Sequence, residues 1–198
     1  MSTYSIVQPP ETGAWELPGR GPVAMVSLII GESAIFTIFV VAYLFYLGKS
    51  LTGPTPAQVL EVPWFNSICL LLSSFTIWRS EHAITVGRIA QFKAWWMATI
   101  ALGASFLAGT ATEWRKLIFQ DGLTIHTNLF GTTFYSLVGL HATHVVLGLV
   151  MLTLVLAIAL AGKIQAEHAE RIKVLALYWH FVDAVWVVVF TVVYILGR

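Results

Sequence analysis

One carboxyl stands in the middle of a long apolar stretch, where ionisable side chains are costly and usually have a function. Glu32 is flanked by Gly31, Ile35, Phe36 and Phe39. Burying a carboxyl among such neighbours costs several kcal/mol that a leucine would not cost. The carboxyl could relay protons, or hold a lipid head group or a cation. Alternatively, it is a protonated acid that hydrogen-bonds to a neighbouring helix. We favour the functional interpretation.

A histidine and an aspartate follow each other at helical spacing in the last apolar stretch, in the sequence YWHFVDAVW. His180 and Asp183 are three residues apart and share one helix face. They could be an acid–base couple, or a metal ligand with a carboxylate behind it. We favour a packing role, in which both side chains hydrogen-bond to neighbouring helices.

Two further histidines have the same spacing in the sequence GLHATHVVLG. His141 and His144 could bind a metal or act as axial haem ligands, but a stable site usually has three or four protein ligands. Only His180 offers itself as a third. Cys69 is the single cysteine, so the sequence has no Cys-x-x-Cys-His haem attachment motif and no internal disulfide. We therefore expect no metal at these histidines and give them a structural role.

The composition shows what kind of protein must hold these groups. Hydrophobic residues make up 58% of the 198 residues and charged residues only 11%, against about 25% in soluble domains. A chain so poor in charge cannot cover a water-facing surface, which excludes an ordinary soluble protein, a disordered tail and a nucleic-acid binder. The net charge of +1 identifies no partner.

Five stretches approach the roughly 20 apolar residues that a membrane-spanning helix needs. Backbone amides in the bilayer core must be bonded within their own segment, so each stretch is predicted to be a helix. The connections are too short for an extramembrane domain, and no signal peptide precedes the first stretch. We expect an all-α bundle of five transmembrane helices, forming one transmembrane domain over residues 1–198. The predicted spans are residues 22–47, 62–82, 94–112, 130–161 and 174–196.

The distribution of basic residues predicts the orientation, because cytoplasmic loops carry more Lys and Arg. With the N-terminus inside and the C-terminus outside, the cytoplasmic segments hold the larger share. The inner residues are then Arg20, Arg79, Arg88, Lys93, Lys163, Arg171 and Lys173, and the outer ones are Lys49, Arg115, Lys116 and Arg198.

Other features predict ordinary membrane packing. Ala101, Ser105 and Gly109 form a stripe of small residues that permits close helix approach, continued by Glu113. Glu81 is expected to be a solvated loop residue. Tryptophans near the span ends are typical of interface anchors; they are Trp15, Trp64, Trp95, Trp96 and Trp114.

Four motifs, in order along nearly the whole chain, resemble subunit III of the haem-copper terminal oxidases. YWHFVDAVWVVVFTVVY at 178–194 resembles the last helix of that family, and FYSLVGLHATHVVLGL at 134–149 resembles the helix before it. GESAIFTIFVVAYLFY at 31–46 resembles the helix with the family's membrane-embedded glutamate, which falls on Glu32. FNSICLLLSSFTIW at 65–78 resembles the next helix.

The resemblance implies a short form of that subunit. Longer family members have seven helices, and this chain is similar to the five-helix form of bacterial quinol oxidases and some bacterial cytochrome c oxidases. The missing pair is then expected as extra helices on subunit I. The location implied is the bacterial cytoplasmic membrane, and no nucleic-acid partner is expected.

The resemblance also implies a function without a catalytic site in this chain. Subunit III of the family binds no haem and no copper; those cofactors are expected in the partner subunits I and II. It packs on subunit I, holds phospholipid and supports proton uptake in an enzyme that couples oxygen reduction to proton translocation in aerobic respiration. Glu32 matches the family's buried carboxyl, and His180 and Asp183 match a motif that is structural there.

Three alternatives stay open at this point. The chain is also similar to the accessory subunit of nitric oxide reductases. Within the oxidases, the electron donor could be quinol, although we favour cytochrome c. A small membrane transporter that uses Glu32 and His144 is a remote alternative, since it leaves four ordered motifs unexplained.

Overall fold

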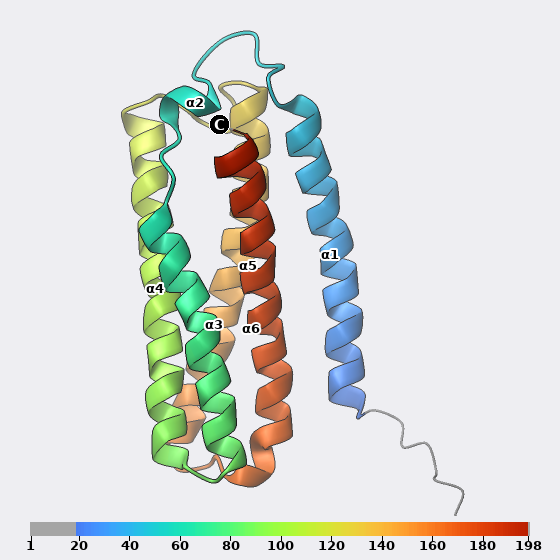
Figure 1. Cartoon of the computed structure of the whole chain (residues 1–198), viewed down its shortest axis with the longest axis vertical. Coiled ribbons are helices and arrows are strands. Elements are labelled where there is room, and N and C mark those ends of the chain that lie inside the picture. Colours follow the sequence, from blue (N-terminus) through green and yellow to red (C-terminus); the bar gives the residue numbers. More distant parts are fainter. Residues whose placement is uncertain (1–18, 198) are drawn as a thin grey trace, which may run out of the picture.

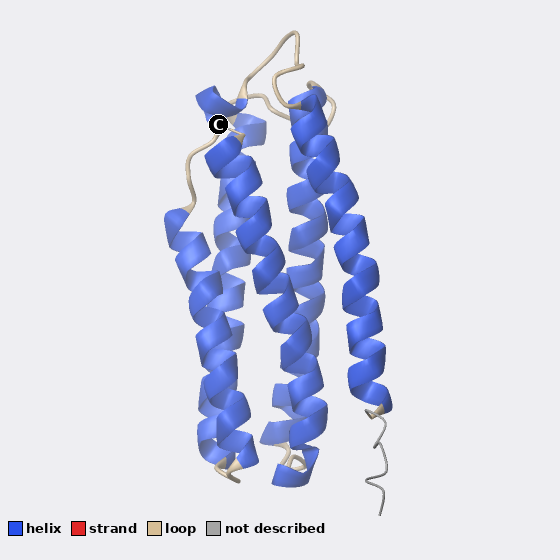
Figure 2. Ribbon diagram, turned by 45° about the vertical axis from the view of Figure 1, so that its right-hand side comes forward, coloured by secondary structure: helices blue, strands red, loops and turns tan. Residues whose placement is uncertain are grey.

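The computed structural model describes residues 19–197, and within that range every regular element is a helix (Figure 2). The all-α prediction is confirmed for this part of the chain. The long helices are α1 (Arg20–Tyr46), α3 (Trp64–Thr85), α4 (Ile89–Phe119), α5 (Leu129–Leu160) and α6 (Ala169–Phe190). The short ones are α2 (Pro56–Val59), the 3₁₀ turn η1 (Ala166–His168) and the π-helical turn η2 (Thr191–Leu196), which continues α6.

Four helical segments of the described range are long and apolar enough to cross a membrane. They are Arg20–Tyr46, Ile89–Phe119, Leu129–Leu160 and Ala166–Leu196. The fifth long helix, α3, occupies the predicted span 62–82 but is not apolar enough to be counted among these four segments. Its sequence explains the difference, because serines and threonines recur along it and Arg79, Glu81 and His82 lie in its last two turns.

Helix α4 is longer than the apolar stretch that predicted it. The predicted span covers residues 94–112, whereas the helix runs from Ile89 to Phe119. Charged residues at both ends, such as Lys93 and Arg115, interrupt the apolar run without interrupting the backbone hydrogen bonds. The length of an apolar run corresponds to the thickness of the hydrocarbon core. The helix itself can continue beyond that core into the interfacial region.

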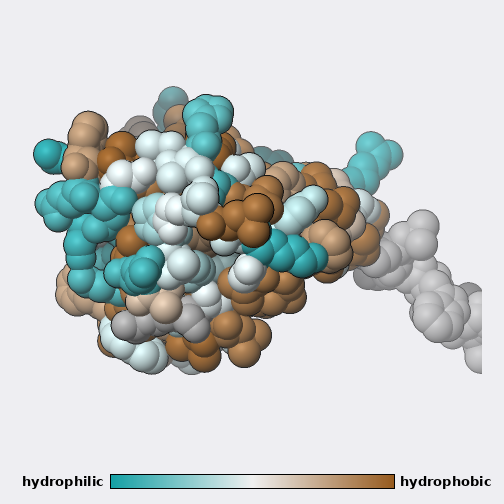
Figure 3. All heavy atoms as spheres, turned by 90° about the horizontal axis from the view of Figure 1, so that it is seen from above, coloured by the Kyte–Doolittle hydropathy of each residue, from teal (hydrophilic) through white to brown (hydrophobic). Residues whose placement is uncertain are grey.

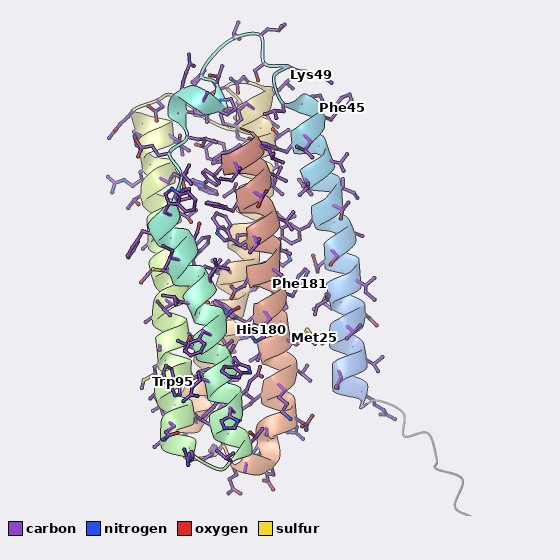
Figure 4. The ribbon with its side chains drawn as sticks, viewed as in Figure 1. Met25, Phe45, Lys49, Trp95, His180 and Phe181 are labelled. Atoms are coloured by element: carbon purple, nitrogen blue, oxygen red, sulfur yellow. The ribbon has the colours of Figure 1, made fainter. Side chains whose placement is uncertain are left out.

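The helices stand side by side, with α1 at one edge of the bundle (Figure 1). Helices α3 and α4 form the most extensive contact, and α6 packs against α3 and α5. The main contacts of α1 are with α5 and α6. Met25 of α1 and Phe181 of α6 point into the same space between these two helices (Figure 4). Helix α1 begins at one end of the bundle (Figure 1), and Gly197 packs against Tyr43 near the other end of α1.

Asn128 fastens the loop after α1 to the start of α5. Its Oδ1 accepts a hydrogen bond from the Gly131 N–H at 2.8 Å, which caps α5. Its Nδ2 donates to the carbonyl oxygens of Thr52 and Pro54 at 3.0 and 3.1 Å. Gly53, between them, has a φ of +85°, a conformation that glycine adopts without strain.

The small residues that allow close packing differ from the predicted stripe. Ala101 and Ser105 are exposed, while Gly103, two residues away, packs against the ring of Trp179. Gly109 does meet a neighbouring helix, where the Asn66 side chain occupies the space that a Cβ would fill. The predicted stripe thus lies largely on an exposed face of α4, whereas the buried Gly103 faces the Trp179 ring.

The tryptophans predicted as interface anchors differ in their exposure. Trp64 is 60% exposed, as expected of an interface anchor, but Trp96 is fully buried. Its indole N–H donates to the Leu152 carbonyl oxygen of α5 at 2.8 Å. The expectation of an interface anchor is therefore wrong for Trp96, which belongs to the core. Trp15 and the basic residue Arg198 lie outside the described residues.

The surface separates polar ends from apolar sides. Viewed from the end that holds Gly197, hydrophilic residues gather over one part, and hydrophobic residues extend toward the edge (Figure 3). Near this end Lys49 Nζ lies 3.4 Å from the centroid of the Phe45 ring, where both residues are labelled in Figure 4. Such a cation–aromatic contact is worth about 0.5–1 kcal/mol at an exposed site.

Candidate functional site

The structure brings the predicted carboxyl Glu32 together with His144. Glu32 lies on α1 and His144 on α5, and Glu32 Oε2 is 3.1 Å from His144 Nε2. The glutamate side chain is 24% exposed and the imidazole 10%. This contact joins the edge helix to the rest of the bundle.

The second ring nitrogen of His144 contacts the backbone of its own helix. His144 Nδ1 lies 2.8 Å from the Leu140 carbonyl oxygen, which can only accept, so Nδ1 carries a hydrogen. The contact between Nε2 and Oε2 then needs one further proton, held either by the imidazole as an ion pair or by the carboxyl as a neutral hydrogen bond. The contact is thus a hydrogen bond or an ion pair that links α1 to α5.

His141 takes no part in this pair. It is fully buried, and neither ring nitrogen has a hydrogen-bond partner among the described residues. Aromatic rings surround it, with centroids 5.8 Å away in Phe106 and 5.0 Å away in Trp186. Phe36 packs against both histidines, 6.5 Å from His141 and 5.0 Å from His144.

No group of three or more histidine, cysteine or carboxylate side chains within residues 19–197 is arranged to hold a metal ion. The two histidines of α5 point to different surroundings, one to a carboxylate and the other to aromatic rings. Neither arrangement brings further ligands together.

His180 and Asp183 both contact Ser74, a serine of the neighbouring helix α3. Ser74 Oγ donates to Asp183 Oδ2 and lies 3.1 Å from His180 Nδ1. Ser73 Oγ lies 3.5 Å from the same carboxylate oxygen and accepts a hydrogen bond from the Trp179 indole N–H at 2.8 Å. Asp183 is 3% exposed, and its Oδ1 has no partner among the described residues.

Glu81 belongs to this cluster, although we expected it to be a solvated loop residue. It lies on α3, its side chain is 21% exposed, and its Oε1 is 3.9 Å from His180 Nε2. A signal was present in the sequence, because Glu81 stands seven residues after Ser74 and so falls on the same helix face two turns away.

A half-buried carboxyl, Glu113, lies at the opposite end of the bundle. Glu113 Oε1 accepts a hydrogen bond from Tyr194 Oη at 2.9 Å. It lines a cavity of about 350 Å³ together with Asn66 and the ion pair of Lys116 with Glu61. The sequence placed Glu113 only as the continuation of a packing stripe.

Comparisons with known proteins give one consistent result. Residues 23–198 match the family model described as "Cytochrome c oxidase subunit III". The chain is 39% identical over 180 residues to a cytochrome c oxidase subunit 3 of Synechocystis sp., covering 87% of this chain and 74% of that protein. It is 34% identical to one of Alkalihalophilus pseudofirmus, covering 84% and 82%. It is 30% identical to a cytochrome bo(3) ubiquinol oxidase subunit 3 of Pseudomonas aeruginosa, covering 85% and 81%.

Proposed function

The chain belongs to the cytochrome c oxidase subunit III family, and from this premise we propose how it serves its enzyme. It is a multi-pass membrane protein and a subunit III of a respiratory haem-copper oxidase complex. Our proposal is that it supports the catalytic subunits by stabilising subunit I, its lipids and its proton uptake. The haem and copper belong, in this proposal, to subunits I and II.

The proposed topology has five membrane crossings, with the N-terminus inside. Helix α3 has 22 residues, which corresponds to about 33 Å, enough to cross a hydrocarbon core of about 30 Å. Its polar side chains point largely to other helices, as Ser74 does to α6 and Ser80 does to the Phe92 carbonyl oxygen of α4. Five crossings also agree with the start of α1 and the end of η2 lying at opposite ends of the bundle. We assign the membrane to the bacterial cytoplasmic membrane.

The contact between Glu32 and His144 is the observation that carries the proposed role in proton uptake. It is a hydrogen bond or an ion pair, partly open to the surroundings, between the edge helix and the bundle. We assign to it the ordering of a lipid head group or of water beside the proton-entry route of subunit I. Direct catalysis by this chain is not part of the proposal.

The apolar outer face of α1 is the surface we assign to contact with subunit I and with lipid. Large hydrophobic side chains on this helix are exposed, and in a soluble environment such a surface would aggregate. They include Val23, Ile30, Ile38, Val41 and Phe45.

The test is the variant Glu32→Gln in the intact oxidase. Glutamine keeps the size and hydrogen-bonding capacity of the side chain but cannot ionise. We expect fewer protons pumped per electron, a shorter turnover lifetime or loss of co-purifying phospholipid. Ser27→Ala, an exposed serine on the same helix that bonds its own backbone, is the matched control. If all three properties stay at the wild-type level, Glu32 has no ionisable role.

We propose cytochrome c as the electron donor, because relatives named cytochrome c oxidase subunit 3 reach higher identity than those named quinol oxidase subunit 3. The partner subunits of the complex, and not this chain, determine the electron donor. Purification of the complex, with an optical spectrum and the sequence of subunit II, tests the assignment. A copper-binding motif in subunit II supports cytochrome c, and its absence supports quinol.

A further inference from the structure

We propose that the interface between α3 and α6 carries a proton line, which connects a cavity at one end of the bundle to Asp183 in its interior. The line consists of Glu81, His180, Ser74 and Asp183. It is separate from the pair of Glu32 and His144, and it does not depend on the role proposed for that pair.

The outer end of the line is accessible. A cavity of about 300 Å³ lies between the start of α1, the end of α3 and the start of α6. Its lining includes Glu81 and His180, with Glu170 and Lys173 of α6 forming an ion pair beside them at 2.7 Å. Pro22 of α1 completes the wall. Water and ions can therefore approach His180 from this side.

The inner end is closed. Asp183 is 3% exposed, and Trp179 and Trp186 on the same helix are fully buried or nearly so. Among the described residues no hydrogen bond continues from Asp183 Oδ1 toward the far end of the bundle, because this atom has no partner there. The geometry points to a proton store rather than a passage across the membrane.

The hydrogen-bond directions along the line are consistent with proton transfer. Ser74 has one hydroxyl hydrogen, which it donates to Asp183 Oδ2. Its contact with His180 Nδ1 at 3.1 Å must then be donated by the histidine, so Nδ1 carries the hydrogen. In the neutral imidazole Nε2 is left with a lone pair, and this atom faces Glu81 Oε1 at 3.9 Å. Figure 4 shows His180 where α3 and α6 lie beside each other.

The transfer balances without any redox partner. Glu81 takes up a proton from water in the cavity and passes it to His180 Nε2, and His180 Nδ1 passes its own proton to Ser74 Oγ. The original hydroxyl proton of Ser74 moves to Asp183 Oδ2. His180 and Ser74 each gain and lose one proton, so the net result is one proton on Asp183. The same steps in reverse release it and restore the starting tautomer.

A purely structural role would not require this arrangement. Packing needs a hydrogen bond for Asp183, and Ser74 on α3 provides it, while the hydroxyl hydrogen of Ser73 goes to the Leu70 carbonyl oxygen at 2.6 Å. It does not require His180 to connect the serine to an open cavity, or a second carboxyl at the entrance. The charged groups around the entrance are Glu81 on α3 and Glu170 and Lys173 on α6, and α1 contributes Pro22 there.

The experiment measures hydrogen–deuterium exchange of the Asp183 carboxyl by infrared spectroscopy in the intact oxidase complex. The protonated carboxyl band is assigned by ¹³C labelling of aspartate and by its loss in Asp183→Asn. On transfer to heavy water, we expect Ser74→Ala and His180→Phe to slow the exchange by about tenfold or more, equivalent to about 1.4 kcal/mol of added barrier. Ser80→Ala, a buried serine on α3 that bonds the Phe92 carbonyl oxygen outside the line, should exchange at the wild-type rate.

Two further variants keep the test decisive. Glu81→Gln, at the open end, preserves the packing around Asp183 and should slow exchange even if Ser74→Ala fails to assemble. Glu32→Gln should leave it unchanged, which separates this proposal from the one above. Wild-type exchange rates in both Ser74→Ala and Glu81→Gln overturn the proposal, as does the lack of any protonated Asp183 band from about pH 5 to pH 8.

Discussion

Gly103 of α4 presents its bare backbone to the ring of Trp179 on α6, so that a Cβ at this position would lie 2.8 Å from Trp179 Cη2. Gly148 of α5 meets the same ring from another helix, again at 2.8 Å. The fully buried indole therefore stands where three helices meet, and it also donates to Ser73 of a fourth, α3. Trp179 organises the centre of the bundle.

Adding a methyl group at this junction should destabilise the protein. We expect Gly103→Ala and Gly148→Ala each to cost about 1–3 kcal/mol, because neither the ring nor the helix backbones can move without losing other contacts. Thermal unfolding of the detergent-solubilised complex measures the loss. Gly139→Ala on α5 is the control, since its Cβ would lie at an ordinary 3.5 Å from Trp114. Equal stability of Gly148→Ala and Gly139→Ala would contradict the packing described.

The buried indole of Trp96 provides a second prediction. Trp96→Phe removes the hydrogen bond to the Leu152 carbonyl oxygen, which keeps only its bond within α5, at a cost of about 0.5–1.5 kcal/mol for the bond and more for the space that the buried indole filled. The same change at Trp64, which is 60% exposed, should alter the unfolding free energy by about 0.5 kcal/mol or less. Denaturant titration compares the two variants, and a larger effect at Trp64 would refute the assignment of Trp96 to the core.

The pair of Glu32 and His144 should show energetic coupling. Because the two side chains are in contact at 3.1 Å, removing one should make removal of the other less costly. A double-mutant cycle with Glu32→Gln and His144→Asn should give a coupling of about 0.5–3 kcal/mol. The readout is proteolytic cleavage in the loop at residues 47–55, which reports opening of α1. Strict additivity of the two changes would mean that the contact contributes nothing.

Asn128 allows its two roles to be separated. Asn128→Ala removes both the cap of α5 and the bonds to Thr52 and Pro54, and we expect a loss of about 0.5–2 kcal/mol with faster cleavage of the 47–55 loop. Asn128→Asp keeps the oxygen that accepts from Gly131 but loses the amide donor. It should retain the stability of α5 while still accelerating loop cleavage. Identical behaviour of the two variants would argue against this division.

The sequence predicted the long helices well because their signal is local. Residues 22–47 and 130–161 were predicted as spans, and the helices occupy Arg20–Tyr46 and Leu129–Leu160. Apolar length alone decides such a segment in a membrane. The short helix α2 was not predicted, since it lies in a polar connection where turn residues dominate.

The rotation of each helix was much less predictable. Trp95 and Trp96 are adjacent, and only the second is fully buried. Glu32 was identified as a candidate from its own surroundings, but its partner His144 comes from a helix more than a hundred positions away. Sequence spacing predicts which residues share one face of a helix. It does not predict which other helix, or which side chain, that face contacts.

The position of α1 has a consequence for how the protein is made. It is synthesised before its main packing partners, α5 and α6. At about 5–20 residues per second, α1 waits on the order of 10 s in the bilayer before those partners exist. During that interval its carboxyl at Glu32 has no His144 to bind. The order of biosynthesis thus places the docking of α1 after the synthesis of α5 and α6.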